Sequence, residues 1–393
     1  MNDTRSVQLP SVGRSMLLLW LAGASMRLTI LAVPPVIAAI QHELALSATQ
    51  VGLLNSLPAA MFALAALPGS LLVKHLGTKR TLCAGLVIVA LGSALRGLNG
   101  GVIGLFATTM LMGAGVAIMQ PAMPATVRQW LPKRIGFGTA VYTNGLLAGE
   151  VLPVVLTLPW VLPAVDSSWR AALVVWSIPV AVVALLLATL APTLGTKSPS
   201  VPQKWLPNWR DGLIWRLAVL FAAINSLYFS ANAFIPGYFV SRGEGAWIGP
   251  ALSALNFGQI PTSFILLAFA QRLERRAWPY FAAGAGALLS LVGIVFGQGL
   301  WAVAGAGLLG ACAGGGLILA LSLPALLSPP EDVARTSAAV FTLSYGSAVV
   351  IAVLSGLAWD LSGIAALAFV PLAACAIALS TICVTFVKRG ELR

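Results

Sequence analysis

The chain is dominated by apolar stretches of about 20–27 residues, separated by short polar or charged connections. A helix of about 20 apolar residues matches the hydrocarbon thickness of a bilayer, whereas barrel strands are shorter and alternate in polarity. Charged residues make up only 9% of the 393 residues, against about 25% in a soluble domain. We therefore predict an all-α membrane protein and exclude a soluble or barrel fold.

The runs predict twelve membrane-spanning helices in two sets of six. The first set lies at residues 15–40, 49–73, 81–98, 102–127, 137–161 and 169–191. The second set lies at residues 215–238, 248–271, 277–297, 300–327, 334–357 and 364–387. The longest connection is rich in Pro, Lys and Trp. We predict an N-terminal six-helix bundle (1–191), a cytoplasmic linker (192–214) and a C-terminal six-helix bundle (215–393).

The positions of the basic residues predict the orientation in the membrane. All but four of the 23 Lys and Arg residues fall on one side of this topology, the exceptions being Arg27 and the external Arg96, Arg170 and Arg242. Cytoplasmic loops carry such an excess of positive charge. We therefore expect a multi-pass protein of the inner (plasma) membrane with both termini in the cytoplasm. This distribution also accounts for the net charge of +12 without a nucleic-acid partner.

The two halves repeat weakly at an offset of 197 residues. Residues 113–115 (GAG) match residues 310–312 (GAC), and Pro132 matches Pro329. Parallel repeats of this kind are related by an axis along the membrane normal in transporters that bind substrate between the repeats near the bilayer midplane.

Arg27 lies in the middle of the first long apolar run. The residues before it carry no charge back to Ser15, and the next charge after it is Glu43. A guanidinium at bilayer depth costs at least about 2.5–3.5 kcal/mol. Its planar fork suits a small oxyanion or a linear anion. We interpret Arg27 as the positive charge that binds the substrate. The alternative is a structural ion pair within the N-terminal bundle.

Glu150 is the only carboxylate well inside a predicted span. Two roles in transport are open at this stage: pairing with Arg27, or carrying a coupling proton once burial raises its pKa. A purely structural salt bridge is the alternative to both. Gly145, Gly149 and Pro153 follow a small-residue spacing that permits close helix packing.

Polar side chains also gather on single helical faces. Asn225, Tyr228 and Asn232 share one stripe of the seventh predicted helix. They either line a substrate cavity, the interpretation we prefer, or form hydrogen bonds between helices. Asn256 and Gln259 repeat the pattern on the eighth helix. The further candidates for substrate binding are Gln120, Tyr142, Asn144 and Tyr345.

Other patterns argue against catalysis and cofactors. Residues 305–310 (GAGLLG) spell a dinucleotide fingerprint, but no strand precedes them and they lie within a predicted helix, so close packing is the better interpretation. The sequence contains no P-loop, and its four Cys and two His show no metal-ligand spacing. We expect no catalytic residue, metal or cofactor, and hence no enzyme.

Several motifs resemble the cyanate/2-nitroimidazole branch of the major facilitator superfamily. They are ASMRLT at residues 24–29, LSATQVGLL at 46–54, LGTKR at 76–80 and GVAIMQ at 115–120. Arg27 matches the branch's Asn-Leu-Arg-Pro start, while Met26 and Leu28 depart from it. The wider superfamily has an acidic residue at the position of Val73. The resemblance covers nearly the whole chain.

Together these features predict a secondary transporter that works by alternating access. The resemblance implies a small anion as substrate, cyanate-like or another small organic or inorganic anion, with protons as a candidate coupling ion. The alternative is proton-coupled efflux of nitroimidazole or other small drug-like compounds, for which the 12 tryptophans offer stacking surface. We expect membrane lipid around the protein, no nucleic acid as partner, and a monomer.

Overall fold

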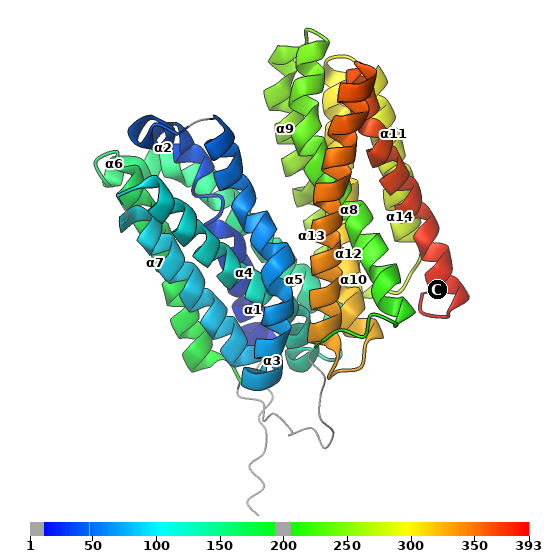
Figure 1. The fold of residues 1–393 in the computed structure, drawn as a ribbon. Helices are drawn as coiled ribbons and strands as arrows, with labels where there is room; N and C mark the ends of the chain where they lie inside the picture. Colours follow the sequence, from blue (N-terminus) through cyan, green and yellow to red (C-terminus); the bar gives the residue numbers. More distant parts are fainter. Residues whose placement is uncertain (1–11, 47, 99, 193–205, 393) are drawn as a thin grey trace, which may run out of the picture. The chain divides into compact units, whose positions relative to one another are not determined.

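The structure, a computed structural model, describes residues 12–46, 48–98, 100–192 and 206–392, and the regular secondary structure within them is all helical (Figure 1). The helices are α1 (Val12–Leu28), α2 (Ile37–Leu44), α3 (Ala48–Leu98), α4 (Val102–Trp130), α5 (Ile135–Leu156), α6 (Leu162–Ala164), α7 (Trp169–Leu190), α8 (Gly212–Ser241), α9 (Ile248–Phe257), α10 (Gln259–Leu273), α11 (Trp278–Phe296), α12 (Leu300–Leu327), α13 (Val333–Ser362) and α14 (Val370–Lys388). Short helical segments adjoin them: η1 (Pro34–Val36), η2 (Thr157–Val161), η3 (Gly245–Trp247) and η4 (Ala365–Phe369).

In the described residues, ten helical segments are long and apolar enough to cross a membrane. One of them, in α3, covers two of the predicted helices. The helix is broken between them at Gly77, which has a φ of 78° and a ψ of 166°. Glycine tolerates this backbone conformation, which other residues rarely adopt. With α1, a further apolar helix of 17 residues, the arrangement is consistent with the twelve predicted spans. The predicted all-α membrane fold is confirmed.

The first predicted helix is wrong in its second half. We expected one helix over residues 15–40, but α1 ends at Leu28. The Arg27 carbonyl oxygen accepts hydrogen bonds from the backbone N–H groups of Ile30 (3.0 Å) and Leu31 (3.1 Å), which closes a turn. Pro34 and Pro35 follow and supply no N–H with which to continue the helix. The chain then resumes as η1 and α2.

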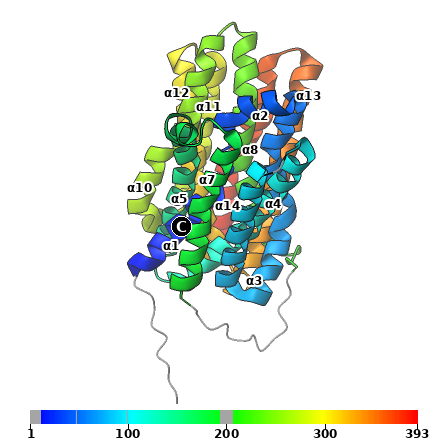
Figure 2. The same cartoon turned by 90° about the vertical axis from the view of Figure 1, so that its left-hand side faces the viewer.

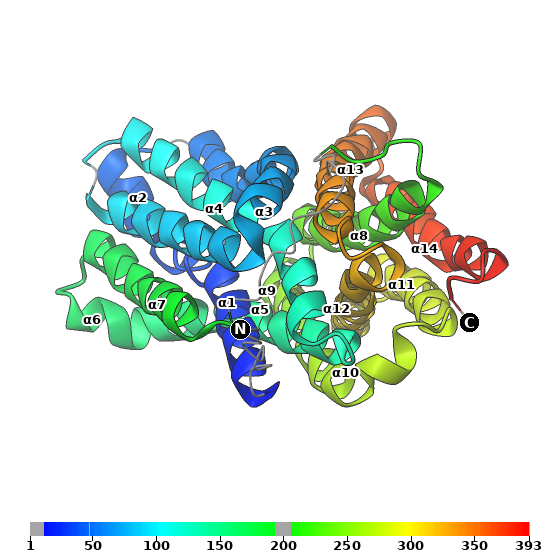
Figure 3. The ribbon, with the colours of Figure 1, turned by 90° about the horizontal axis from the view of Figure 1, so that it is seen from below.

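The chain divides into two compact units, residues Met1–Pro207 with Pro329–Ala338, and Asn208–Ser328 with Ala339–Arg393. In the first unit, α1 packs along α5, and α3 packs against α4 and α7 (Figures 2 and 3). In the second unit, α12 contacts α8, α9, α10 and α11, and α14 packs against α8 and α11. Residues 193–205 of the predicted linker lie outside the described residues.

The glycines of α12 allow its close contacts in the second unit. A Cβ on Gly310 would overlap the backbone carbonyl of Leu255 in α9, and one on Gly305 would lie 2.9 Å from the Ser290 carbonyl oxygen in α11. The fingerprint-like residues 305–310 therefore lie inside a helix and serve close packing, as the sequence context predicts.

Candidate functional site

The contact between α1 and α5 is built on glycines that face backbone atoms of the opposite helix. A Cβ on Gly145 would overlap the Trp20 carbonyl oxygen, and one on Gly149 would overlap that of Ala24. Gly23 of α1 faces the Tyr142 carbonyl in the same way. The small-residue spacing predicted for α5 therefore brings the two backbones together. This contact continues toward Arg27 on α1 and Glu150 on α5.

Arg27 and Glu150 form an ion pair across this helix contact. Arg27 Nε lies 3.3 Å from Glu150 Oε1, with side-chain exposures of 18% and 29%. The Arg27 guanidinium also lies over the Phe62 ring of α3, 5.4 Å from its centroid. Neither side chain is fully enclosed within the unit. The pair is formally neutral, and its state depends on whether Glu150 carries a proton.

The other predicted site residues of the first unit differ in position. Asn144 accepts a 2.9 Å hydrogen bond from Trp20 Nε1, so it lies on the same α1–α5 contact as the ion pair. Tyr142, two residues earlier on α5, is 2% exposed, and Gln120 of α4 is 8% exposed. All three have polar groups within the helical core of this unit, and their roles in substrate binding stay predictions.

In the second unit, three of the predicted residues form one hydrogen-bonded group. The Tyr228 hydroxyl donates to Asn256 Oδ1, and Asn256 Nδ2 donates to Asn232 Oδ1 at 3.0 Å. Asn232 Nδ2 in turn donates to the Tyr228 carbonyl oxygen at 2.9 Å. The polar stripe of α8 thus meets the polar face of α9. All three side chains are partly exposed.

The remaining predicted residues of the second unit are more enclosed. Asn225 is 5% exposed and donates a 2.6 Å hydrogen bond to Ser344 of α13. This geometry favours hydrogen bonding between helices, the alternative that the sequence left open for this stripe. Gln259 is 7% exposed, with Nε2 placed 3.4 Å from the Asn256 carbonyl oxygen. The Tyr345 ring lies 6.1 Å from that of Phe229.

Arg96, which we expect on the external side of the membrane, is not exposed to solvent in the structure. Arg96 lies in the last turn of α3 and is only 1% exposed. Its Nη2 donates hydrogen bonds to the Thr29 carbonyl oxygen (2.6 Å) and to Ser93 Oγ (3.3 Å). One sequence signal indicates this burial: Arg96 follows the uncharged run 81–95 and lies within the predicted helix 81–98.

Within the described residues there is no group of three or more His, Cys, Asp or Glu that could hold a metal ion. The four cysteines are free thiols inside helices. The groups that these sites offer are one ion pair, amides, hydroxyls and aromatic faces.

Comparison with known proteins agrees with this architecture. The family model of the Major Facilitator Superfamily matches residues 17–352. The chain belongs to this superfamily, and it is a multi-pass membrane transporter.

Two Escherichia coli (strain K12) proteins and one from Bacillus subtilis (strain 168) are among its relatives. The cyanate transport protein CynX is 27% identical over 268 residues, covering 66% of this chain and 68% of that protein. The uncharacterized transporter YycB of B. subtilis is 27% identical over 318 residues, covering 77% and 76%. The E. coli 2-nitroimidazole transporter is 26% identical over 229 residues, covering 56% of each.

Solved structures show the same fold. The transporter FucP in its outward conformation superposes with a TM-score of 0.75 at 16% identity, covering 96% of this chain and 98% of that one. The proton:xylose symporter XylE bound to 6-bromo-6-deoxy-D-glucose also gives 0.75, at 12% identity, covering 96% and 95%. At these identities the likeness concerns the fold alone.

Proposed function

We propose that this protein transports a small, cyanate-like anion across the inner membrane by alternating access, with Arg27 as its anion-binding residue. The observation that carries the proposal is the ion pair of Arg27 with Glu150, held between two closely packed apolar helices. A charge pair at this depth is expensive and seldom kept without a function. The relative named as a cyanate transport protein supports a small anion as substrate.

The pair also suggests how proton and anion would be coupled. While Glu150 is ionised, its carboxylate neutralises Arg27 and competes with any incoming anion. When a proton neutralises Glu150, the charge of Arg27 becomes available to the substrate, so each ligand favours binding of the other. Proton and anion would then cross together in a protein with both termini in the cytoplasm, working as a monomer.

Glu150→Gln tests this coupling, because the amide mimics the protonated carboxyl. In proteoliposomes, we expect anion exchange between the two sides to continue while uptake driven by a pH gradient is lost. Glu331→Gln, at an exposed position, is the matched control and should keep both activities. Gradient-driven uptake at the wild-type rate in Glu150→Gln would refute the role of Glu150.

A second candidate is proton-coupled efflux of nitroimidazole or another small drug-like compound. Three neighbouring aromatic rings of the second unit favour an aromatic substrate. Tyr345 is stacked on Phe341, with ring centroids 6.4 Å apart, and its ring also lies near that of Phe229. One relative is named as a 2-nitroimidazole transporter. Cells expressing this protein would then accumulate less 2-nitroimidazole than cells expressing Tyr345→Ala.

A further inference from the structure

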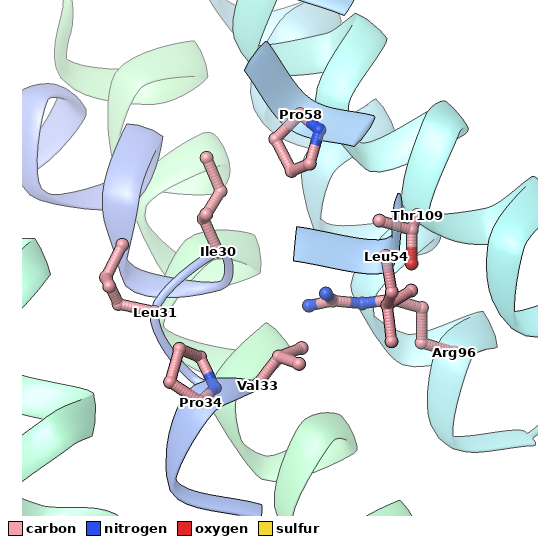
Figure 4. Close-up of a pocket in the computed structure, with 8 residues that line it drawn as sticks. All are labelled: Ile30, Leu31, Val33, Pro34, Leu54, Pro58, Arg96 and Thr109. Atoms are coloured by element: carbon pink, nitrogen blue, oxygen red, sulfur yellow. The ribbon is translucent and has the colours of Figure 1, made fainter. Parts of the chain in front are cut away.

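Arg96 lines a cavity of about 210 Å³ in the first unit. Its walls come from the turn after α1, from α3 and from α4, and they are lined by Ile30, Leu31, Val33, Pro34, Leu54, Pro58, Arg96 and Thr109. Figure 4 shows the guanidinium extending into this space toward Ile30 and Val33. Apart from Arg96 and Thr109, every lining side chain is apolar.

The guanidinium is buried with only part of its hydrogen-bonding capacity used. Nη2 binds the Thr29 carbonyl and Ser93, but Nε is buried without an acceptor. Among the residues that the structure describes, no carboxylate lies within 4.0 Å of Arg96. The contact with Thr29 satisfies a carbonyl at the C-terminal end of α1, a structural role that needs neither the cavity nor the other nitrogens. A buried charge is normally paired with an opposite charge, and the described residues supply none to Arg96.

We propose that this cavity is a binding site for a small, weakly hydrated monovalent anion, with Arg96 as its cationic ligand. One guanidinium balances one negative charge, and apolar walls cannot replace the water around a strongly hydrated divalent anion. The volume is below the about 300–1,000 Å³ of pockets for drug-sized ligands, which suits an anion of a few atoms. Pro34, one of the lining residues, is exposed at the surface of the unit.

This site is independent of the transport mechanism proposed above, because Arg27 does not line it. Binding of radiolabelled thiocyanate to the purified full-length protein, measured by equilibrium dialysis at constant ionic strength, tests it directly. We expect binding to persist in Arg27→Gln, which removes any binding at Arg27, and to weaken about tenfold to a hundredfold when Arg96→Gln is added to that variant, the loss that follows from removing a charged hydrogen bond. Sulfate at equal ionic strength should not compete.

A second variant keeps the guanidinium and removes the space. Ile30→Phe should weaken thiocyanate binding while Arg96 remains, whereas Ile103→Phe, at a position 86% exposed, should bind as the wild type does. Ile30→Phe therefore tests the anion site even if Arg96→Gln does not fold. Undiminished affinity after Arg96→Gln or Ile30→Phe is added to Arg27→Gln would overturn the proposal. Loss of all binding in Arg27→Gln would also overturn it and would assign the anion to the Arg27–Glu150 pair instead.

Discussion

The glycine contact between α1 and α5 leads to a prediction for Gly149→Ala. The added Cβ would overlap the Ala24 carbonyl oxygen and lie 2.8 Å from the carbonyl carbon and 2.9 Å from Cα. Ordinary contact between carbon atoms is about 3.5–4.0 Å, so the two backbones must separate by roughly 0.6–1.2 Å. Overpacking of this kind costs about 1–3 kcal/mol.

Because Glu150 is the next residue, the same displacement should lengthen its 3.3 Å contact with Arg27. We therefore expect Gly149→Ala to lower both the free energy of unfolding and the rate of transport. Gly13→Ala on α1 is the control, since its Cβ would meet nothing within 4 Å. It should be neutral or stabilise the protein slightly. Unfolding in detergent and uptake in proteoliposomes measure the two effects, and wild-type values of both in Gly149→Ala would refute the close packing of α1 on α5.

Two further predictions concern hydrogen bonds in each unit. Tyr228→Phe removes the donor to Asn256 and should cost about 0.5–1.5 kcal/mol of unfolding free energy as well as weakening substrate binding. Unchanged stability would contradict that hydrogen bond. The Arg170 hydrogen bond, with that of Trp169, holds the pKa of Glu43 below its usual range. These two hydrogen bonds therefore stabilise the fold fully above the ordinary glutamate pKa of about 4.3. Their stabilisation is lost as the pH falls through the lowered pKa of Glu43. Wild type should be more thermally stable than Glu43→Gln at pH 6, and this difference should shrink as the pH falls below the ordinary glutamate pKa; a difference independent of pH would refute this assignment.

Much of the fold could be predicted from the lengths of the apolar stretches alone. Residues 102–127 and 300–327 were predicted as helices and are found at Val102–Trp130 and Leu300–Leu327. Such helices follow from the need to satisfy every backbone polar group in lipid. The end of α1 at Leu28 could not be predicted in this way, because it depends on the turn at residues 28–31 and on Arg96 from a distant helix.

The candidate site shows the same limit. Pairing of Arg27 with Glu150 was among the expected alternatives, because the two are the charges deepest in their apolar runs. The bond from Tyr228 to Asn256 joins residues on two helices, and sequence periodicity places each on a face without assigning its partner. The burial of Arg96 likewise arises from packing between α3 and the turn after α1.

The measurement that tests the central claim most directly is uptake of radiolabelled cyanate into proteoliposomes containing wild type, Arg27→Lys or Arg27→Ala. We predict saturable uptake by wild type, none by Arg27→Ala, and little by Arg27→Lys, because a point charge does not reproduce the planar fork of a guanidinium. Each variant should remain folded in the membrane, as judged by its elution in size-exclusion chromatography. Uptake by Arg27→Ala at the wild-type rate would contradict the account.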